Sequence, residues 1–283
     1  MLNELRVTTA TASCAGRRRR TNADAYLVDE AAGLLAVGDG MGDTPRSAAV
    51  AKMALEAVRE MFLDPWLSRP PAERTIGEAV ERLCLGVVQA NGRLFVPAAR
   101  RSAPRSGTTL VAVVLCARQL CVVSVGDSRA YLLRDSGGRL ERLTRDDTVL
   151  QESLRLGVPY AVAIAERDAH ALTRAIGVRA AVEAAPIIHR SGTGDTLLLC
   201  TDGLTDRVHD EEITDVLAYE EDLERAAYRL IERAREAGGW DDATVVLARR
   251  GSGAGAEGED VASVHESGVR RIDECQSRGG VPS

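Results

Sequence analysis

The apolar residues of this chain gather in short runs that are rich in Val and Leu and bounded by Gly, Asp or Ser. Such runs predict β-strands. They cover Ala25–Val28, Leu34–Val37, Thr109–Leu115, Leu120–Val125, Ala130–Leu133, Thr196–Cys200 and Thr244–Ala248. Because the middle runs follow one another across hairpin-sized gaps, they favour antiparallel sheets over regular β-α-β alternation.

Three longer segments repeat apolar residues at helical spacing and predict helices over Arg46–Phe62, Ile76–Leu94 and Leu223–Ala237. A glycine pair, Gly238-Gly239, follows the last one as a stop signal. The apolar positions that should face the core are Val50, Met53, Ala54, Val58 and Met61, then Ala79, Val80, Leu83, Val87 and Ala90, then Ala226, Ala227, Leu230 and Ala234. We expect an α+β fold in which helices pack on antiparallel sheets.

One domain is expected over residues 1–250. From Gly251 the chain reads "GSGAGAEGED" and stays polar and charged to Ser283. Too little of this segment can be buried to offset chain entropy, so residues 251–283 are predicted to be a disordered tail.

Composition narrows the function classes. The chain has 283 residues, of which 45% are apolar and 28% charged, as in a soluble globular protein. A net charge of −6 argues against a nucleic-acid partner, whose binding needs a basic footprint. No apolar run approaches the ~18 residues of a membrane span. The six scattered cysteines suit a reducing compartment, and the threonine-rich N-terminus has no signal-peptide pattern, so we expect a cytoplasmic protein without a membrane partner.

Carboxylates recur where the apolar runs end. Asp39 ends "LLAVGD", Asp127 follows "VVSVG", Asp202 follows "TLLLCT", and Asp241-Asp242 precede a predicted strand. Any one of these sites alone is better explained as a turn, because Asp-Gly pairs are common in turns. Several on one domain predict an acidic cluster, and a cluster of like charges needs a divalent cation such as Mg²⁺ or Mn²⁺. The Gly40 carbonyl can approach such an ion, because glycine has no side chain.

A dinucleotide-binding loop is the other interpretation of "GDGMG". The spacing is GxGxG rather than GxGxxG, and Asp39 would place a negative charge against a pyrophosphate. Residue Glu60, about 20 positions further on, falls inside a predicted helix rather than at a strand end. The cation site is therefore the better prediction.

Eight sequence blocks, in order, resemble the metal-dependent protein serine/threonine phosphatases of the PP2C type in their bacterial form. They are "RTNADAYLV", "LLAVGDGMGD", "SGTTLVAVVL", "VVSVGDSRAYLLRDSG", "LTRDDTVLQE", "LTRAIG", "GDTLLLCTDGLTD" and "GGWDDATVV", and they span about Arg19 to Ala248. The resemblance implies an α-β-β-α sandwich of two antiparallel β-sheets flanked by antiparallel helix pairs, with the metals in a cleft at one end of the sheets.

The resemblance also implies roles for single residues. Asp39 would bridge two metal ions, one of them also bound by the Gly40 carbonyl, while Asp202 and Asp241 hold the other. Asp127 with Asp202 would bind a third, weaker metal, and Asp24 would act through water. Arg19, three residues before Asn22, would grip the substrate phosphate, although Arg17, Arg18 and Arg20 are neighbouring candidates. On composition alone, Arg17–Arg20 is equally well a solvated turn.

The implied mechanism is attack of a metal-bridging hydroxide on the phosphorus of phosphoserine or phosphothreonine, without a phospho-enzyme. Some family members carry a histidine after the Asp-Gly pair, where this chain has Met41. His170 is a candidate acid, but a surface histidine without a role is the better interpretation.

Other positions depart from the family pattern. Ala23 replaces an acid or amide, Asp43 a glycine, Thr44 a histidine and Asp242 an asparagine, and Arg145–Thr148 replaces an Asp-His-Ser run. An extra carboxylate at Asp242 would either strengthen metal binding or face solvent. Residues 146–172 would form a flap beside the cleft. None of these changes removes a core ligand, so we predict an active enzyme.

The expected activity is that of a monomeric phosphoprotein phosphatase opposing bacterial serine/threonine kinases. Two alternatives share the fold: a regulatory phosphatase acting on an anti-sigma antagonist, and a non-catalytic phosphoprotein-binding module. A two-metal nuclease would also use clustered carboxylates, but the acidic pI of 5.4 counts against it.

Overall fold

The computed structural model describes residues 7–95, 106–135 and 138–251. Its strands form two antiparallel sheets of five strands each. In spatial order, the first sheet holds β1 (Val7–Cys14), β10 (Ala243–Arg250), β9 (Thr196–Cys200), β6 (Arg129–Leu133) and β7 (Leu140–Arg142). The second holds β2 (Asp24–Asp29), β3 (Leu34–Asp39), β4 (Leu110–Cys116), β5 (Gln119–Val125) and β8 (Ile187–Arg190).

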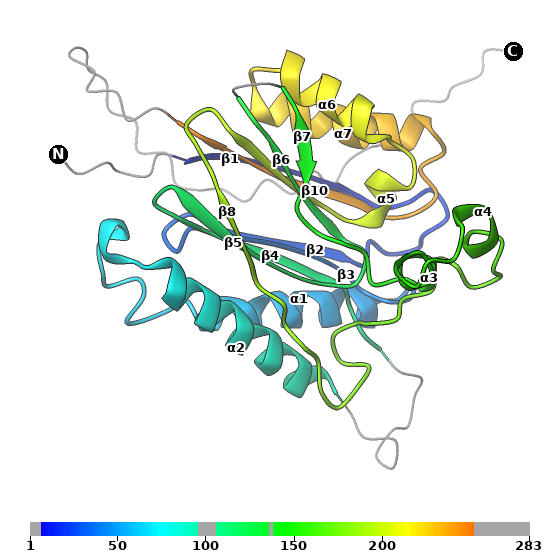
Figure 1. Ribbon diagram of the computed structural model, residues 1–283, viewed down its shortest axis with the longest axis horizontal. Coiled ribbons are helices and arrows are strands. Elements are labelled where there is room, and N and C mark those ends of the chain that lie inside the picture. The colour runs from blue at the N-terminus through cyan, green and yellow to red at the C-terminus, as the bar shows by residue number, and fades with distance from the viewer. Residues whose placement is uncertain (1–6, 96–105, 136–137, 252–283) are drawn as a thin grey trace, which may run out of the picture. The chain divides into compact units, whose positions relative to one another are not determined.

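Helices cover the outer faces of both sheets, as Figure 1 shows. The described helices are α1 (Pro45–Glu60), α2 (Ile76–Leu94), α3 (Val149–Arg155), α4 (Tyr160–Ala163), α5 (Asp202–Thr205), α6 (Asp210–Tyr219) and α7 (Leu223–Glu236), with a 3₁₀ turn at Pro71–Glu73, and α3 and α4 lie to one side of the sheets. The pair α1 and α2 packs on the second sheet, and α6 and α7 lie over the first. The predicted α-β-β-α sandwich is confirmed.

Three layers of apolar side chains hold this sandwich together, because successive residues of a strand point to opposite faces. In β3, Leu34 and Ala36 face α1 and α2, whereas Leu35 and Val37 face the other sheet. In β9, Leu198 packs toward α6 and α7. Strands buried on both faces have continuous apolar sequences, which is why the strand predictions from short runs are correct.

The predicted helices match closely. The α2 prediction is correct in both bounds, α7 ends one residue earlier than predicted, and α1 begins one residue earlier and ends two earlier. Thr44 caps α1 by accepting a hydrogen bond from the backbone N–H of Ser47. One core prediction is wrong: Met53 is 47% exposed, because it lies on the outer side of α1.

Other elements lacked a strong sequence signal. The threonine-rich β1, which pairs along its whole length with β10, was not predicted, nor were β7, β8 and the helices between 149 and 219. The strand β8 lies at a sheet edge with Ile187 and Ile188 both 47% exposed, so it lacks a buried face and its alternation.

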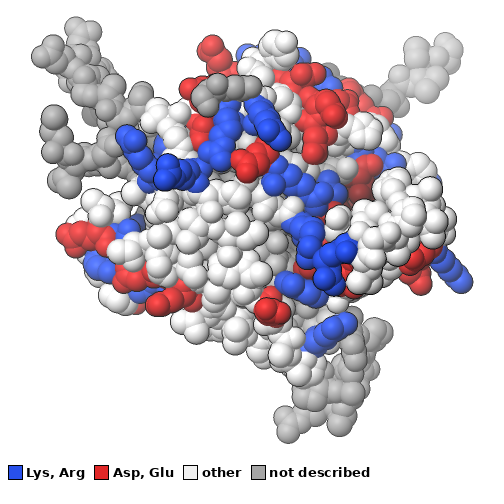
Figure 2. All heavy atoms as spheres, in the orientation of Figure 1, with Lys and Arg blue, Asp and Glu red and all other residues white. Residues whose placement is uncertain are grey.

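The described residues, 7–251 with their gaps, belong to one compact unit. The predicted domain boundary at residue 250 and the tail over 251–283 stay predictions, since residues 252–283 lie outside those described. Among the described residues, no helix is both long and apolar enough to cross a membrane. On the face drawn in Figure 2, basic side chains lie beside acidic ones.

Candidate active site

Carboxylates from both sheets meet at one end of the sandwich. Asp24 is the first residue of β2 and Asp39 the last of β3, and the two are direct partners across the strand pair. Asp202 opens α5 directly after β9, and Asp241 lies just before β10. Asp127 lies in the turn between β5 and β6. Rigid strand ends from the two sheets therefore carry all five side chains.

Hydroxyl groups join the two sheets beside these carboxylates. Thr201 of the first sheet donates a hydrogen bond of 2.8 Å to Asp24 Oδ2 of the second. Thr109 lies 2.7 Å from the Ser128 hydroxyl and accepts the backbone N–H of Asp39 at 2.8 Å. These bonds fix the separation of the sheets where the acids converge.

The carboxylates raise one another's pKa values, which shows that the structure brings them together. Burial is the first cause at each, followed by hydrogen bonds or neighbouring charges. The pKa of Asp24 rises to about 8 and that of Asp127 to about 6. The pKa values of Asp39 and Asp202 lie well above the ordinary range, first through burial, and the charge of Asp39 raises the pKa of Asp202 further. Asp241 contributes its charge to both.

A hard cation fits this group of donors. Oδ1 of Asp24 and Oδ1 of Asp202 are buried and lack a hydrogen-bond partner. A buried carboxylate oxygen without a donor costs free energy, and a divalent cation would supply the missing positive charge. Within the described parts of the chain, no three acidic, histidine or cysteine side chains are already grouped so as to hold a metal ion.

Asp241 is held by Arg19 through both of its carboxylate oxygens. Arg19 Nε donates to Oδ1 at 2.6 Å and Nη2 donates to Oδ2 at 2.5 Å. The neighbours of Arg19 behave differently: Arg18 stacks on Trp240, and the backbone N–H groups of Arg20 and Thr21 donate to Asp43. Of the four arginines in this run, Arg19 is thus the one paired with an acid of the cluster.

Asp242 binds backbone N–H groups at the base of the arginine run. It is 2% exposed, so the alternative in which it faces solvent is wrong. Its Oδ1 accepts the N–H of Gly16 at 2.9 Å, and its Oδ2 accepts the N–H of Ala23 at 2.8 Å. Asp242 therefore fastens the chain on both sides of the arginine run to the start of β10.

The segment predicted as a flap begins with two structural carboxylates. Asp146 forms ion pairs with Arg129 and Arg142, and Asp147 accepts the N–H of Gly126 at 2.9 Å. This second bond ties the segment to the turn that carries Asp127. Beyond it lie α3 and α4, and an isolated bridge joins Thr148 to Leu172.

The position of the family histidine and the candidate acid are both exposed. Met41, which stands where some family members carry a histidine, is 41% exposed, and its thioether carries no proton. His170 is also exposed, and its charge favours the ionised form of Asp206, although burial dominates and raises the pKa of Asp206.

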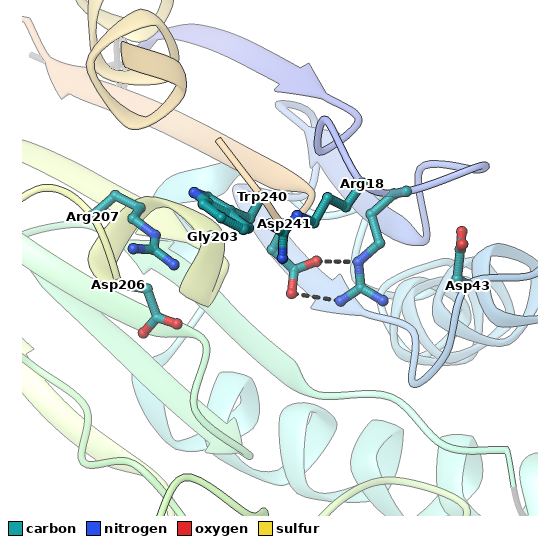
Figure 3. A pocket seen from close by; sticks show the side chains of 8 residues that line it. Arg18, Asp43, Gly203, Asp206, Arg207, Trp240 and Asp241 are labelled. Carbon is teal, nitrogen blue, oxygen red and sulfur yellow. Dashed lines mark hydrogen bonds and ion pairs between the residues drawn. The ribbon is translucent and has the colours of Figure 1, made fainter. Parts of the chain in front are cut away.

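A pocket of about 300 Å³ opens beside the cluster (Figure 3). It is lined by Arg18, Arg19, Asp43, Gly203, Asp206, Arg207, Trp240 and Asp241. Asp206, Arg207 and Trp240 were not predicted as site residues. Asp206 follows Asp202 by four positions, the spacing of one helical turn, and that is the signal from which it could have been found.

The family model described as protein phosphatase 2C matches residues 16–239 of this chain. The chain belongs to the protein phosphatase 2C family. It is 33% identical over 224 residues to the serine/threonine phosphatase stp of Listeria welshimeri, a match that covers 77% of this chain and 84% of the relative.

Solved structures of protein phosphatase 2C members share the fold. The Mycobacterium tuberculosis serine/threonine phosphatase PstP/Ppp superposes with a TM-score of 0.73 at 29% identity, covering 87% of this chain and 99% of that one. The catalytic domain of PstP in complex with two manganese ions gives a TM-score of 0.70 at 31% identity, covering 87% and 99%. Family membership confirms the predicted fold and enzyme class and does not favour a dinucleotide-binding protein, a nuclease or a non-catalytic module.

Proposed function

We propose that this protein phosphatase 2C member hydrolyses phosphoserine and phosphothreonine side chains of proteins in a metal-dependent reaction. The observation that carries the proposal is the buried group of strand-end carboxylates with Arg19 against it. Carboxylates alone would suit a cation-binding site of any kind. A guanidinium beside them adds a group whose planar donors match a phosphate monoester.

The cation ligands follow from the donors at the cluster. Asp39, Asp202, Asp241 and the Gly40 carbonyl would hold two divalent ions, Mn²⁺ or Mg²⁺. Asp127 with Asp202 would hold a third, weaker ion, and Asp24 would act through water. The oxygen-only donor set and the unpartnered oxygens of Asp24 and Asp202 support this assignment. Cations bound here would act as Lewis acids, lowering the pKa of water and offsetting the phosphate charge.

Arg19 would bind and orient the phosphoryl group. Its Nε and Nη2 form the two-pronged donor pair that now meets Asp241, and the same pair fits two phosphate oxygens. With the phosphoryl group held in this way, water can approach the phosphorus from the side opposite the serine or threonine oxygen. A new bond from water oxygen to phosphorus forms as the phosphorus–alkoxide bond breaks.

The departing alkoxide needs a proton. Met41 cannot supply it, and His170 is exposed near Asp206. We propose that water is the proton source and that His170 is not required.

The substrates are phosphoproteins, and we propose that the enzyme opposes serine/threonine kinases in a bacterial signalling pathway. An anti-sigma antagonist would meet the same catalytic core, so that alternative differs only in the partner. The cytoplasmic location, the monomeric state and the absence of nucleic-acid and membrane partners stay predictions from the sequence.

The test is hydrolysis of p-nitrophenyl phosphate and of a phosphothreonine peptide, with Mn²⁺ and with EDTA. We expect turnover with Mn²⁺ alone. Asp202→Asn should abolish it, and calorimetric titration should show that Mn²⁺ binding is weakened in the same variant. Asp215→Asn, the same change at an exposed position of α6, is the matched control and should keep both properties. A folded wild-type protein that binds Mn²⁺ without turnover would overturn the proposal.

A further inference from the structure

An exposed tryptophan lies between two arginines at the edge of the active site (Figure 3). The Trp240 side chain is 40% exposed, and the Arg18 guanidinium carbon lies 3.2 Å from the centre of its ring system. The guanidinium carbon of Arg207 lies 6.0 Å from the same centre. All three residues line the pocket that also contains Asp241. We call Trp240, Arg18 and Arg207 the Trp240 shelf.

The backbone around the shelf is built for close packing. Gly238 has a φ of +130°, and a Cβ there would come within 2.2 Å of Trp240 Nε1, so the indole lies directly on this glycine. A Cβ on Gly16 would lie 2.5 Å from the Trp240 carbonyl oxygen. The N–H of Arg17 donates to the Gly239 carbonyl at 2.6 Å. These contacts pack the run Arg17–Arg20 against residues 238–240, which precede β10.

The charges of the shelf arginines are available to a ligand. The Arg19 guanidinium is hydrogen-bonded to Asp241. The Asp43 carboxylate accepts the backbone N–H groups of Arg20 and Thr21 rather than a guanidinium. Among the residues the structure describes, Arg18 and Arg207 form no ion pair with a carboxylate, although Arg207 favours the ionised form of nearby Asp206. A guanidinium that stacks through its face keeps its N–H edge for hydrogen bonds. The shelf thus presents oriented N–H donors in the pocket that Asp241 also lines.

We infer that the Trp240 shelf binds an anionic group of the phosphoprotein next to the phosphorylated residue, either a carboxylate or a second phosphate. This inference rests on the proposed function, because the shelf borders the pocket into which the phosphorylated side chain would enter. Binding at the shelf stabilises the bound substrate and the transition state by the same free energy. A preference for anionic peptides should therefore appear in KM rather than in kcat.

The experiment compares three phosphothreonine peptides at constant ionic strength. Their neighbouring positions hold alanine, glutamate or a non-hydrolysable phosphonate analogue of phosphoserine. We expect kcat/KM with Mn²⁺ to be about tenfold higher for at least one anionic peptide than for the alanine peptide, the gain expected from one charge-assisted hydrogen bond. The glutamate and phosphonate arms separate the two sources of negative charge.

Substitutions then test whether the shelf residues cause the preference for anionic peptides. Arg18→Gln and Arg207→Gln should each reduce the ratio of anionic to neutral kcat/KM several-fold, through KM. Trp240→Leu should reduce it with both arginines present, and Trp240→Phe should restore most of it, since a ring face remains. Arg225→Gln removes an equal charge from a 71% exposed side chain on α7 and should leave the ratio unchanged.

The outcomes separate the inference from the proposed function. Metal-dependent turnover of the alanine peptide without any anionic preference overturns the inference and leaves the phosphatase intact. A preference that survives the arginine substitutions, or falls equally in Arg225→Gln, also overturns it. No turnover of any peptide by folded, Mn²⁺-loaded protein removes the proposed function and the inference with it.

Discussion

Arg19 and Asp241 are 222 positions apart in the chain, yet two hydrogen bonds join the guanidinium to both carboxylate oxygens. We propose another ligand for each partner: the substrate phosphate for Arg19 and a cation for Asp241. In that case the pair would link the two functions of the site, because a ligand that draws one side chain away would release the other.

Removing the arginine should separate these functions. In Arg19→Ala, Asp241 no longer shares its oxygens and a positive charge is lost beside the cluster, so we expect Mn²⁺ to bind several-fold more tightly. We also expect kcat/KM for a phosphopeptide to fall roughly a hundredfold, as when a transition-state donor is removed. Calorimetric titration and steady-state kinetics measure the two effects. Weaker Mn²⁺ binding in this variant would contradict the interpretation of the pair.

The raised pKa of Asp24 makes stability depend on pH when divalent ions are chelated. The pKa is about 8 in the folded state, against about 3.9 for an unperturbed aspartate. Between pH 6 and 8 the unfolded chain has already lost this proton while the folded protein keeps it. The free energy of unfolding in EDTA should therefore fall as pH rises, by up to about 1.4 kcal/mol per pH unit for this one proton.

Urea unfolding at pH 6, 7 and 8 measures that slope. Asp24→Asn cannot lose a proton and still accepts the Thr201 hydrogen bond, so its slope should be flatter than that of the wild type. Equal slopes for the two proteins would show that Asp24 titrates normally.

Asp242 should matter for stability. Asp242→Ala leaves the buried N–H groups of Gly16 and Ala23 without acceptors, at a cost of roughly 3 kcal/mol. Asp242→Asn keeps one acceptor oxygen and should cost less. Urea unfolding in EDTA ranks the variants, and an Asn variant less stable than the Ala variant would be inconsistent with this account.

Two glycine substitutions should act in opposite directions. A Cβ on Gly40 would lie 2.1 Å from the Ser47 carbonyl oxygen, so Gly40→Ala should lower the free energy of unfolding by about 3 kcal/mol. Gly92 lies in α2 with nothing within 4 Å of a Cβ, so Gly92→Ala should raise stability by about 0.5–1 kcal/mol. Thermal unfolding of both variants compares them, and a neutral Gly40→Ala would mean that the strand end is not tightly packed.

The sequence predicted antiparallel sheets covered by helices because the central strands are buried on both faces and therefore appear as apolar runs, whereas the arrangement of two sheets in a sandwich was implied by the family resemblance. It also identified Asp39, Asp127 and Asp202 as ends of such runs. The strand β1 was not predicted because it is rich in threonine and buries only Ala10 and Ala12, and β8 was not predicted because its isoleucines are exposed. The role of Asp242 could not be predicted, since its partners Gly16 and Ala23 are brought to it only by the pairing of β1 with β10. The Trp240 shelf depends on the same pairing.

That pairing also fixes when the enzyme can mature during its synthesis. The strand β10 lies between β1 and β9, so β1 has no partner in the first sheet until residue 250 has left the ribosome. Asp241 and Trp240 arrive on the same stretch of nascent chain. The second sheet, whose strands and covering helices come earlier, can form beforehand. A ribosome stalled before β10 would therefore carry a chain that lacks Asp241 and has β1 unpaired, and we expect phosphatase activity to appear only once residues 241–250 have been added.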